Sequence, residues 1–236
     1  MTKKKFFSIV IITKNEQKYL PILLESIHKQ DFHDYEIIVS DADSTDKTRK
    51  IAKAEGCKIV LGGPIDVGRN NGAFVAKGEY IVFLDADMQL PPNFLSLVKE
   101  KIDQKNAQIG SVFLQFDTNK ISLRLLYFFS DWTFYVTQRI RPHGFGGCIF
   151  VNKSLHKTIG GFRDILPFED QDYIHRATKI ANRFYLLRKP VVLTTSRRIE
   201  KDGYLYVIFR CLRMITTQLL GGARKGSIEY DYDYDE

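Results

Sequence analysis

Four short apolar segments recur in the first third of the chain, and they constrain its fold more than any other feature. Each is rich in β-branched or aromatic residues and is too short for a typical helix. Their sequences are FFSIVII (6–12), EIIVS (36–40), KIVL (58–61) and YIVFL (80–84). Such runs predict strands that are buried on both faces, as in a parallel sheet.

Segments with helical periodicity separate these strands. An apolar stripe over residues 19–27 predicts one helix. Ser44 and Asp46 predict the cap and the first-turn acid of a second helix, and a third is expected over 68–77. Alternating strands and helices form βαβ units. The sequence therefore predicts an α/β fold with a mostly parallel central sheet flanked by helices.

The second half of the chain is less regular. We expect strands over 107–116, 148–151 and 190–195, and helices over 121–140, from about 169, and over 203–220. With no linker or repeat in view, we predict one domain over 1–200, with an amino-terminal half over 1–100 and a carboxy-terminal half over 101–200. A C-terminal helical extension over 201–226 and an acidic disordered tail over 227–236 would follow.

The composition narrows the classes of partner and compartment. The formal charge of +7 favours an anionic partner, but no module that reads nucleic acid is recognisable, so nucleic acid is not expected. The three cysteines show no zinc or disulfide spacing, which fits a reducing compartment. The amino terminus does not resemble a signal peptide, and no apolar run approaches the ~18 residues of a membrane span. We therefore expect a cytoplasmic protein.

Polar clusters follow three of the predicted strands. They are Thr13 to Glu16, Asp41 to Ser44, and Asp85 to Asp87. In open parallel sheets, ligands bind beyond the carboxyl ends of the strands. The three clusters are therefore expected to line one edge of the sheet. Acids gathered there would repel one another unless a cation or a polar ligand lay among them.

The segment Asp85-Ala86-Asp87 ends the most apolar strand and precedes two prolines. Hard divalent cations bind carboxylate oxygens and commonly bridge them to ligand phosphates. We expect Asp87 to bind such a cation directly, and Asp85 to act through water or to hold sugar hydroxyls. The amide oxygen of Gln89 is a further candidate ligand. The alternative is a solvated turn.

The motifs together resemble family-2 glycosyltransferases of the GT-A fold. The matching stretches are SIVIITKNE (8–16), EIIVSDADSTDKT (36–48), GRNNGAFVAKGEYIVFLDAD (68–87), GGCIFVNKS (147–154) and GGFRDILPFEDQDY (160–173). This resemblance implies a nucleotide-sugar donor, Mg²⁺ or Mn²⁺ as cofactor, and inversion at the anomeric carbon. The stretch DADMQLPP also resembles dolichyl-phosphate mannose synthases, in which a glutamine at the place of Gln89 joins the metal site.

The resemblance also implies which residues bind the donor. The expected donor-binding residues are Thr13, Asn15, Glu16, Asp41, Arg69, Asp85, Ala86, Asp87, Gly147 and Arg198. Several have plainer alternatives. Asn15 could cap a helix, Asp43 could only start one, and Arg69 and Arg198 could be surface residues. Lys14 is expected to be solvated. Histidine ligands found in relatives are missing after His175, so His143 is a second candidate for the third metal contact.

An inverting transfer needs a general base for the acceptor hydroxyl. By resemblance, the pair Glu169-Asp170 lies at a helix start facing the donor. We expect Asp170 to be the base and Glu169 to orient the acceptor, whereas Asp172 stabilises the first helical turn.

We therefore expect an inverting glycosyltransferase that uses a UDP- or GDP-linked sugar. The resemblance implies that residues 1–200 are its GT-A catalytic domain, with a nucleotide-binding half over 1–100 and an acceptor half over 101–200. Its acceptor would be a glycan or a polyprenyl or other lipid phosphate. Amphipathic helices over 121–140 and 203–220 allow peripheral contact with the cytoplasmic face of a membrane. Two other classes remain open. One is a sugar nucleotidyltransferase, which would want a glycine-rich basic loop after the first strand. The other is a protein that binds nucleotide sugars without catalysis.

Overall fold

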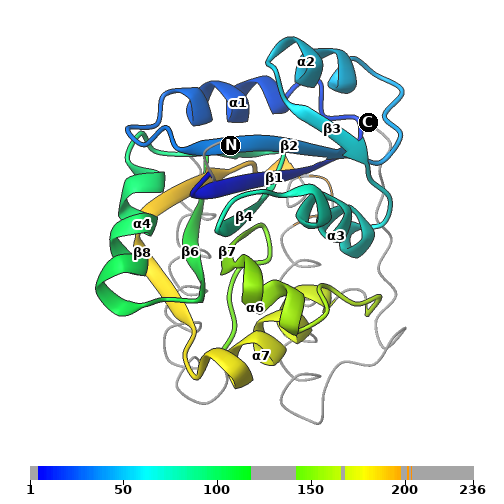
Figure 1. The fold of residues 1–236 in the computed structure, drawn as a ribbon. Coiled ribbons are helices and arrows are strands. Elements are labelled where there is room, and N and C mark those ends of the chain that lie inside the picture. Colours follow the sequence, from blue (N-terminus) through cyan, green and yellow to red (C-terminus); the bar gives the residue numbers. More distant parts are fainter. Residues whose placement is uncertain (1–4, 118–141, 166–167, 198–200, 202, 204–236) are drawn as a thin grey trace.

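The protein is described by a computed structural model that covers residues 5–117, 142–165, 168–197, 201 and 203. Its sheet has eight strands in the order β3-β2-β1-β4-β7-β6-β8-β5, with helices on both faces (Figure 1). The strands are β1 (Phe7–Thr13), β2 (Tyr35–Asp41), β3 (Lys58–Leu61), β4 (Tyr80–Asp85), β5 (Met88–Gln89), β6 (Ile109–Phe116), β7 (Cys148–Asn152) and β8 (Tyr185–Thr194). The helices are α1 (Leu20–His28), α2 (Thr48–Ala54), α3 (Ile65–Val75), α4 (Phe94–Lys105), α6 (Lys153–Thr158) and α7 (Glu169–Ala181).

The first four strands form the parallel half of the sheet. In the register of these strands, Thr13 lies beside Asp41 and Ile12 lies beside Asp85. The carboxyl ends of β1, β2 and β4 therefore meet at one edge, as the sequence predicted. The polar residues that follow these strands are brought together by strand register alone.

The prediction that the third apolar run, KIVL, is buried on both faces is wrong. It forms β3, which pairs only with β2 and lies at the end of the strand order. Ile59 is 37% exposed and Leu61 is 76% exposed. A four-residue apolar run does not report whether a second neighbour exists, so an edge strand and a central strand look alike in sequence.

The second half of the sheet is mixed. β7 runs antiparallel to both β4 and β6, β6 is parallel to β8, and β5 is antiparallel to β8. Just before β7, the N–H of Asp85 donates a hydrogen bond to the carbonyl of Gly147 at 3.0 Å. The glycine pair Gly146-Gly147 is therefore fixed directly against the end of β4.

Two apolar clusters hold the helices to the sheet. One contains buried residues of α1 and α4 together with Phe7, Ile9 and Val82. The other contains buried residues of α3, α6 and α7 together with Val10 and Phe83. Alternate residues of β1 thus pack against opposite layers. Figure 1 shows α1 on one side of the sheet and α3, α6 and α7 on the other. Burial of both faces explains why β1 and β4 are apolar throughout.

Several boundaries differ from those expected. The second helix begins at Thr48, because Ser44 and Asp46 use their side chains in the loop before it. The third begins at Ile65 instead of 68, and the last strand begins at Tyr185 instead of 190. The expected helices over 121–140 and 203–220 and the tail over 227–236 lie outside the described residues, apart from Gly203.

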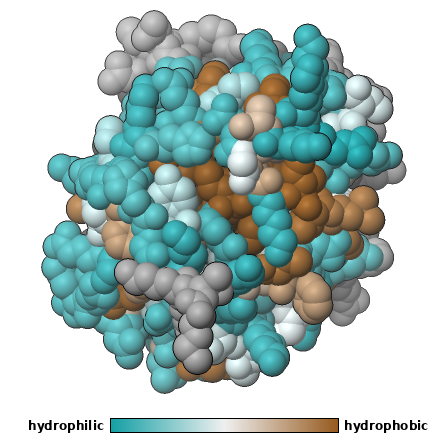
Figure 2. Space-filling model, turned by 45° about the horizontal axis from the view of Figure 1, so that its top comes forward, coloured by the Kyte–Doolittle hydropathy of each residue, from teal (hydrophilic) through white to brown (hydrophobic). Residues whose placement is uncertain are grey.

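Some large apolar side chains of the described residues reach the surface. They are Ile22, Ile59, Leu61, Val67, Phe74 and Ile180. Figure 2 shows one face on which a hydrophobic area lies among hydrophilic residues. Phe74, on α3, is 88% exposed and contributes little to the core.

Within the part of the chain that the structure covers, no helix combines the length and the apolar character needed to cross a bilayer.

We expect Gly72→Ala to destabilise the fold by about 1–3 kcal/mol, because added methyl groups strain a packed core. Gly72 is buried on α3, and a Cβ there would collide with the side chain of Val10 on β1. Phe74→Ala, two residues along the same helix, is the matched control and should change stability by less than about 0.5 kcal/mol. Urea unfolding of both variants would measure this, and equal stabilities would contradict the packing described.

Candidate active site

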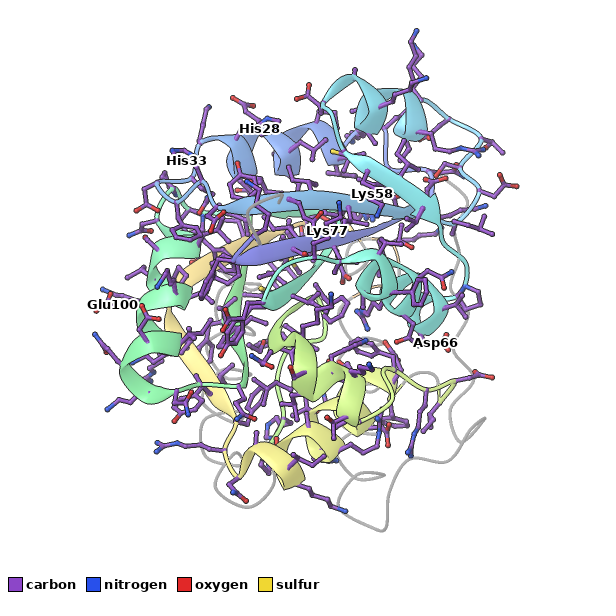
Figure 3. All side chains as sticks on the ribbon, viewed as in Figure 1. His28, His33, Lys58, Asp66, Lys77 and Glu100 are labelled. Carbon is purple, nitrogen blue, oxygen red and sulfur yellow. The ribbon has the colours of Figure 1, made fainter. Side chains whose placement is uncertain are left out.

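Four loops converge at the carboxyl edge of the parallel strands. They follow β1, β2, β4 and β8, and side-chain hydrogen bonds join them in pairs. Thr13 donates to Asp41 at 2.8 Å, and Thr195 donates to Asp87 at 2.8 Å. Arg197 binds Glu16 through two nitrogens, at 2.5 and 3.1 Å. The histidines of α1 and the following loop, His28 and His33, lie at the far end of that helix (Figure 3).

Asp41 is a structural centre of this edge. Its carboxylate is buried and accepts hydrogen bonds from the Thr13 hydroxyl at 2.8 Å, the Ser44 hydroxyl at 2.6 Å and the Ser44 N–H at 2.9 Å. Arg49 approaches it at 3.4 Å. Asp43, by contrast, is exposed, has a φ of 58° and pairs with Arg49 at 2.9 Å. It does not start a helix. The contact of Asp41 with a nucleotide base stays a prediction.

The loop after β1 is tied to the loop after β2. Asn15 has a φ of 54°, and its side-chain oxygen accepts the N–H of Thr45 at 2.9 Å. It therefore caps a turn of the neighbouring loop, and Tyr19 is the N-cap of α1. The prediction that Lys14 is solvated is wrong. Its ammonium group donates to the carbonyls of Ala42 and Asp43 at 2.8 and 3.1 Å.

Arg197 connects the β1 loop to the acids after β4. Beyond its two bonds to Glu16, its Nε lies 3.7 Å from Asp87, and its guanidinium lies 4.7 Å from the ring centre of Tyr19. Burial raises the pKa of Glu16, while Arg197 opposes that rise. A fixed cation thus faces two carboxylates of the expected donor site. Arg198, the expected donor-binding residue, lies outside the described residues.

The segment Asp85-Ala86-Asp87 turns sharply at the end of β4. Ala86 points into the core and is 3% exposed, whereas the side chains of Asp85 and Asp87 remain 39% and 19% exposed. Their partly open carboxylates are hard oxygen donors of the type that Mg²⁺ and Mn²⁺ prefer. No cluster of three or more histidine, cysteine, aspartate or glutamate residues suited to a metal occurs in the described ranges.

Gln89 lies one strand further on. It forms β5 with Met88, is exposed, and pairs in register with Leu193 of β8. Its part in a metal site stays a prediction, as does that of His143. Metal binding by Asp85 and Asp87 likewise stays a prediction, in which substrate phosphates and waters would complete the ligand set.

Arg69 joins the two halves of the site. It lies in the second turn of α3, not at the helix start, and its side chain is 4% exposed. One guanidinium nitrogen is 3.2 Å from Glu169, and the other is 3.4 Å from Asp85 and 3.1 Å from the carbonyl of Gly146. The surface alternative for this arginine is therefore excluded. Its planar fork suits such divided contacts.

Asp170 lies in the first turn of α7, beside Glu169. Burial raises the pKa of the Asp170 carboxyl from 3.8 to about 7, and the neighbouring charge of Glu169 adds to the rise, while Arg69 opposes it. Its oxygens accept the N–H of Gln171 at 2.7 Å and the side-chain amide of Gln171 at 3.2 Å. A carboxyl with a pKa near 7 is suited to exchange a proton at neutral pH.

Glu169 and Asp172 have different surroundings. One oxygen of Glu169 accepts from Arg69, and the other is buried with no hydrogen-bond partner among the described residues. Such a buried acceptor is costly unless a ligand hydroxyl or a water reaches it. Asp172 pairs with Arg176 one turn later at 2.6 Å, so its role is to stabilise the helix.

The glycine pair separates the acids of β4 from those of α7. A Cβ on Gly146 would collide with the carboxylate of Asp170, and one on Gly147 would lie 2.9 Å from an oxygen of Asp85 and collide with Met88. A side chain at position 146 would therefore displace Asp170, and one at position 147 would require Met88 and Asp85 to move. The structure thus brings Asp85, Arg69, Glu169 and Asp170 around one stretch of bare backbone.

Sequence reasoning missed four residues that organise the site: Lys14, Ser44, Thr195 and Gln171. Each acts through a partner on another segment or through the backbone. Only their proximity to predicted strand or helix ends gave any sign of a role. Their partners depend on loop conformation, which strand periodicity does not report.

Comparison with known proteins gives one family. The family model described as "Glycosyl transferase family 2" matches residues 8–160. The chain is 33% identical over 122 residues to a GalNAc(5)-diNAcBac-PP-undecaprenol beta-1,3-glucosyltransferase of Campylobacter jejuni, with 48% of this chain and 40% of that protein covered. It is 26% identical over 246 residues to the poly(ribitol-phosphate) beta-N-acetylglucosaminyltransferase TarS of Staphylococcus aureus, with 91% and 40% covered.

Solved structures show the same fold. TarS residues 1–349 of S. aureus in complex with UDP-GlcNAc match with a TM-score of 0.63 at 22% identity, covering 80% of this chain and 58% of that one. The mannosyltransferase PcManGT of Pyrobaculum calidifontis, in complex with GDP-Man and Mn²⁺, matches with a TM-score of 0.72 at 17% identity, covering 94% and 66%. The predicted GT-A fold is thereby confirmed.

The chain spans about two-fifths of the length of the curated relatives described above. The family match itself covers more than half of this chain, from the first strand to the loop before α7. The shared fold and this match lead to one conclusion: the chain belongs to glycosyl transferase family 2.

Proposed function

We propose that the chain transfers a sugar, with inversion, from a nucleotide diphosphate sugar to an acceptor hydroxyl or lipid phosphate. The observation that carries this proposal is the position of Asp170, whose pKa is about 7, next to Glu169, which binds the buried Arg69 that also reaches Asp85. A proton acceptor and an acidic, cation-binding strand end face one another across two glycines. An inverting displacement needs that separation of base and leaving group.

The donor is expected to lie along the loops after β1, β2 and β4. Thr13, Asn15, Glu16 and Asp41 line the end expected to hold the base and ribose. Asp41 accepts hydrogen bonds from Thr13 and Ser44, and Glu16 accepts them from Arg197, so both carboxylates are already oriented and little reorganisation is needed when a ligand binds. Two structural relatives are solved with UDP-GlcNAc and with GDP-Man, which supports a UDP- or GDP-linked donor here.

A divalent cation fits the acids after β4. Asp87 and Asp85 would hold it, with Gln89 as a further candidate, and the bound ion would neutralise charge on the leaving diphosphate. The Mn²⁺ named with PcManGT supports this assignment. Thr195 keeps Asp87 oriented toward the site. Arg197, which already faces Glu16 and Asp87, is placed to meet the anionic end of a donor.

Asp170 removes the acceptor proton as the acceptor hydroxyl attacks the anomeric carbon. One oxygen of Glu169 has no hydrogen-bond partner among the described residues, and it would accept a hydrogen bond from a hydroxyl of the acceptor or the donor sugar. The C. jejuni relative carries an undecaprenol-linked glycan in its name, which supports a glycan or lipid-linked acceptor. An acceptor that is a lipid phosphate would need only orientation, and the reaction would then take place at a membrane surface.

We expect Asp170→Asn to lower turnover by about 10²–10⁴-fold, because general-base catalysis contributes on that scale. Donor affinity should change by less than about threefold. Turnover assays and calorimetric titration with the donor would measure the two quantities. Asp103→Asn, at an exposed acid of α4 that pairs with Lys99, is the control and should keep turnover. Equal losses of donor binding and turnover in Asp170→Asn would sink the assigned role.

The rate should also depend on pH through Asp170. The base must be deprotonated, so kcat/KM should rise as pH increases through about 7 and fall roughly tenfold per unit below that. A flat profile between pH 5.5 and 8.5 would contradict the base assignment.

Stability gives an independent check on Asp170. Its pKa is higher in the folded chain than in the unfolded one, so its contribution to stability is present at low pH and lost as pH rises through about 7. The Tm of Asp170→Asn relative to the wild type should therefore be higher at pH 8 than at pH 5.

Metal dependence is testable without turnover. We expect Mn²⁺ to raise the Tm of the wild type in the presence of UDP or GDP, because a bound ligand stabilises the folded state. Asp87→Ala should abolish that increment, whereas Asp103→Ala, an exposed acid on α4, should preserve it. A panel of UDP-, GDP- and TDP-sugars, each with and without Mn²⁺, would identify the donor. An increment that survives Asp87→Ala would place the cation elsewhere.

A further inference from the structure

Asn70, the neighbour of Arg69 on α3, holds a loop from the other half of the protein. Its side-chain NH₂ donates to the carbonyl of Phe162, and its side-chain oxygen accepts the N–H of Phe162, both at 2.9 Å. The amide thus binds one backbone residue through both of its groups, as a neighbouring strand would. The two residues are 92 positions apart in the sequence.

Gly161 makes this close approach possible. Its φ is +72°, in the left-handed region that favours glycine. A Cβ at this position would collide with the side-chain oxygen of Asn70. The conformation of the loop and the length of the asparagine side chain are therefore matched to one another.

The same loop is held from its other side by α7. Arg176 donates to the carbonyl of Ile159 at 2.6 Å and to that of Gly161 at 2.7 Å, while its Nε binds Asp172. The ring of Phe162 stacks on the ring of Tyr173, with centroids 3.9 Å apart and planes 6° apart. Hydrogen bonds and ring stacking therefore hold residues 159–162 against α7, the helix that begins with Glu169 and Asp170.

Arg69 completes the connection. Its guanidinium lies 5.0 Å from the ring centre of Phe162 and binds Glu169 at 3.2 Å. One turn of α3 thus touches the loop through Asn70, and both the loop and the first turn of α7 through Arg69. A shift of the loop would displace α7 relative to Arg69, because Arg176 and Tyr173 move with it.

We propose that Asn70 is a positioning residue: it fixes the 159–162 loop so that α7 presents Glu169 to Arg69 and holds Asp170 beside Gly146. Asn70 itself reaches the reacting groups only through its partners. The inference rests on the proposed function, since it assigns the means by which the base is placed. It predicts that Asn70 affects the chemical step more than donor binding, because misplacing a reacting group by about 1 Å costs on the order of 10²-fold.

The test compares two adjacent asparagines. Asn70→Ala should lower kcat by about 10–100-fold and change the donor KM by less than about threefold. Asn71→Ala is the matched control: Asn71 lies next along α3, and its side chain bonds to the carbonyl of Leu61 at the sheet edge. It should leave both constants within about twofold. Asn70→Asp, which keeps the acceptor for the Phe162 N–H, should fall between the wild type and Asn70→Ala, and it carries the test if Asn70→Ala does not fold.

A second arm approaches the contact from the loop. Gly161→Ala should lower kcat in the wild-type background, because its Cβ collides with Asn70. In the Asn70→Ala background the added loss should be smaller, since the colliding oxygen is gone and only the backbone strain remains. Such non-additivity is expected of residues in direct contact.

The outcomes separate this inference from the proposed function. A wild-type protein that transfers no sugar from any donor of the panel would sink the proposed function. An active wild type with Asn70→Ala retaining its kcat within twofold would overturn only the positioning role. An equal loss in kcat and in donor affinity, or additive effects of the two substitutions, would also overturn it.

Discussion

The rest of the site depends on the ion pairs that the buried guanidinium of Arg69 forms with Asp85 and Glu169. The guanidinium lies between Asp85 of β4 and Glu169 of α7, which belong to the two halves of the domain. Removing one partner of a buried ion pair commonly costs about 3–5 kcal/mol, because a desolvated charge is left behind. The three charges therefore constrain one another. If the two halves moved apart, Arg69 would lose Asp85 or Glu169, and a charged group would be left without its partner.

Around this centre, the site is built from hydrogen bonds between loops. Thr13, Ser44 and Asp41 connect two loops, Arg197 and Glu16 connect two others, and Thr195 holds Asp87. Each contact fixes a polar group before any ligand arrives. Electrostatic catalysis depends on such fixed groups, because their orientation is settled during folding and not during the reaction. The sheet provides the frame, but these contacts set where each oxygen points.

The sequence predicted the frame well, because strand periodicity and strand order are local and regular. Apolar runs identified β1, β2 and β4, and the parallel arrangement then placed Thr13, Asp41 and Asp85 at one edge. The start of α7 at Glu169 followed from the same kind of pattern, together with the family resemblance. The strand register and the start of α7 at Glu169 confirm these expectations.

The details that failed have a common physical origin. Lys14 was expected in solvent, but its ammonium group binds the backbone carbonyls of Ala42 and Asp43. Every residue type has a backbone carbonyl, so the sequence does not indicate such a partner. Ile59 and Leu61 are exposed because, within the described part of the chain, no further strand pairs with β3 on its outer side. The residues of β3 do not indicate whether such a strand exists. Ser44 was expected to cap a helix, but its hydroxyl serves Asp41 and Asn15 instead. Tertiary partners decide between alternatives that are equal in local sequence.

The bare backbone at positions 146 and 147 has a further consequence. The carboxyl group of Asp170 lies against Gly146 and that of Asp85 lies against Gly147, and both come this close because glycine has no Cβ. The peptide at these positions therefore limits how closely the carboxylates of Asp85 and Asp170 approach one another. A side chain at position 146 would push Asp170 outward, so a substitution there would change the distance between two acids that belong to different halves of the domain.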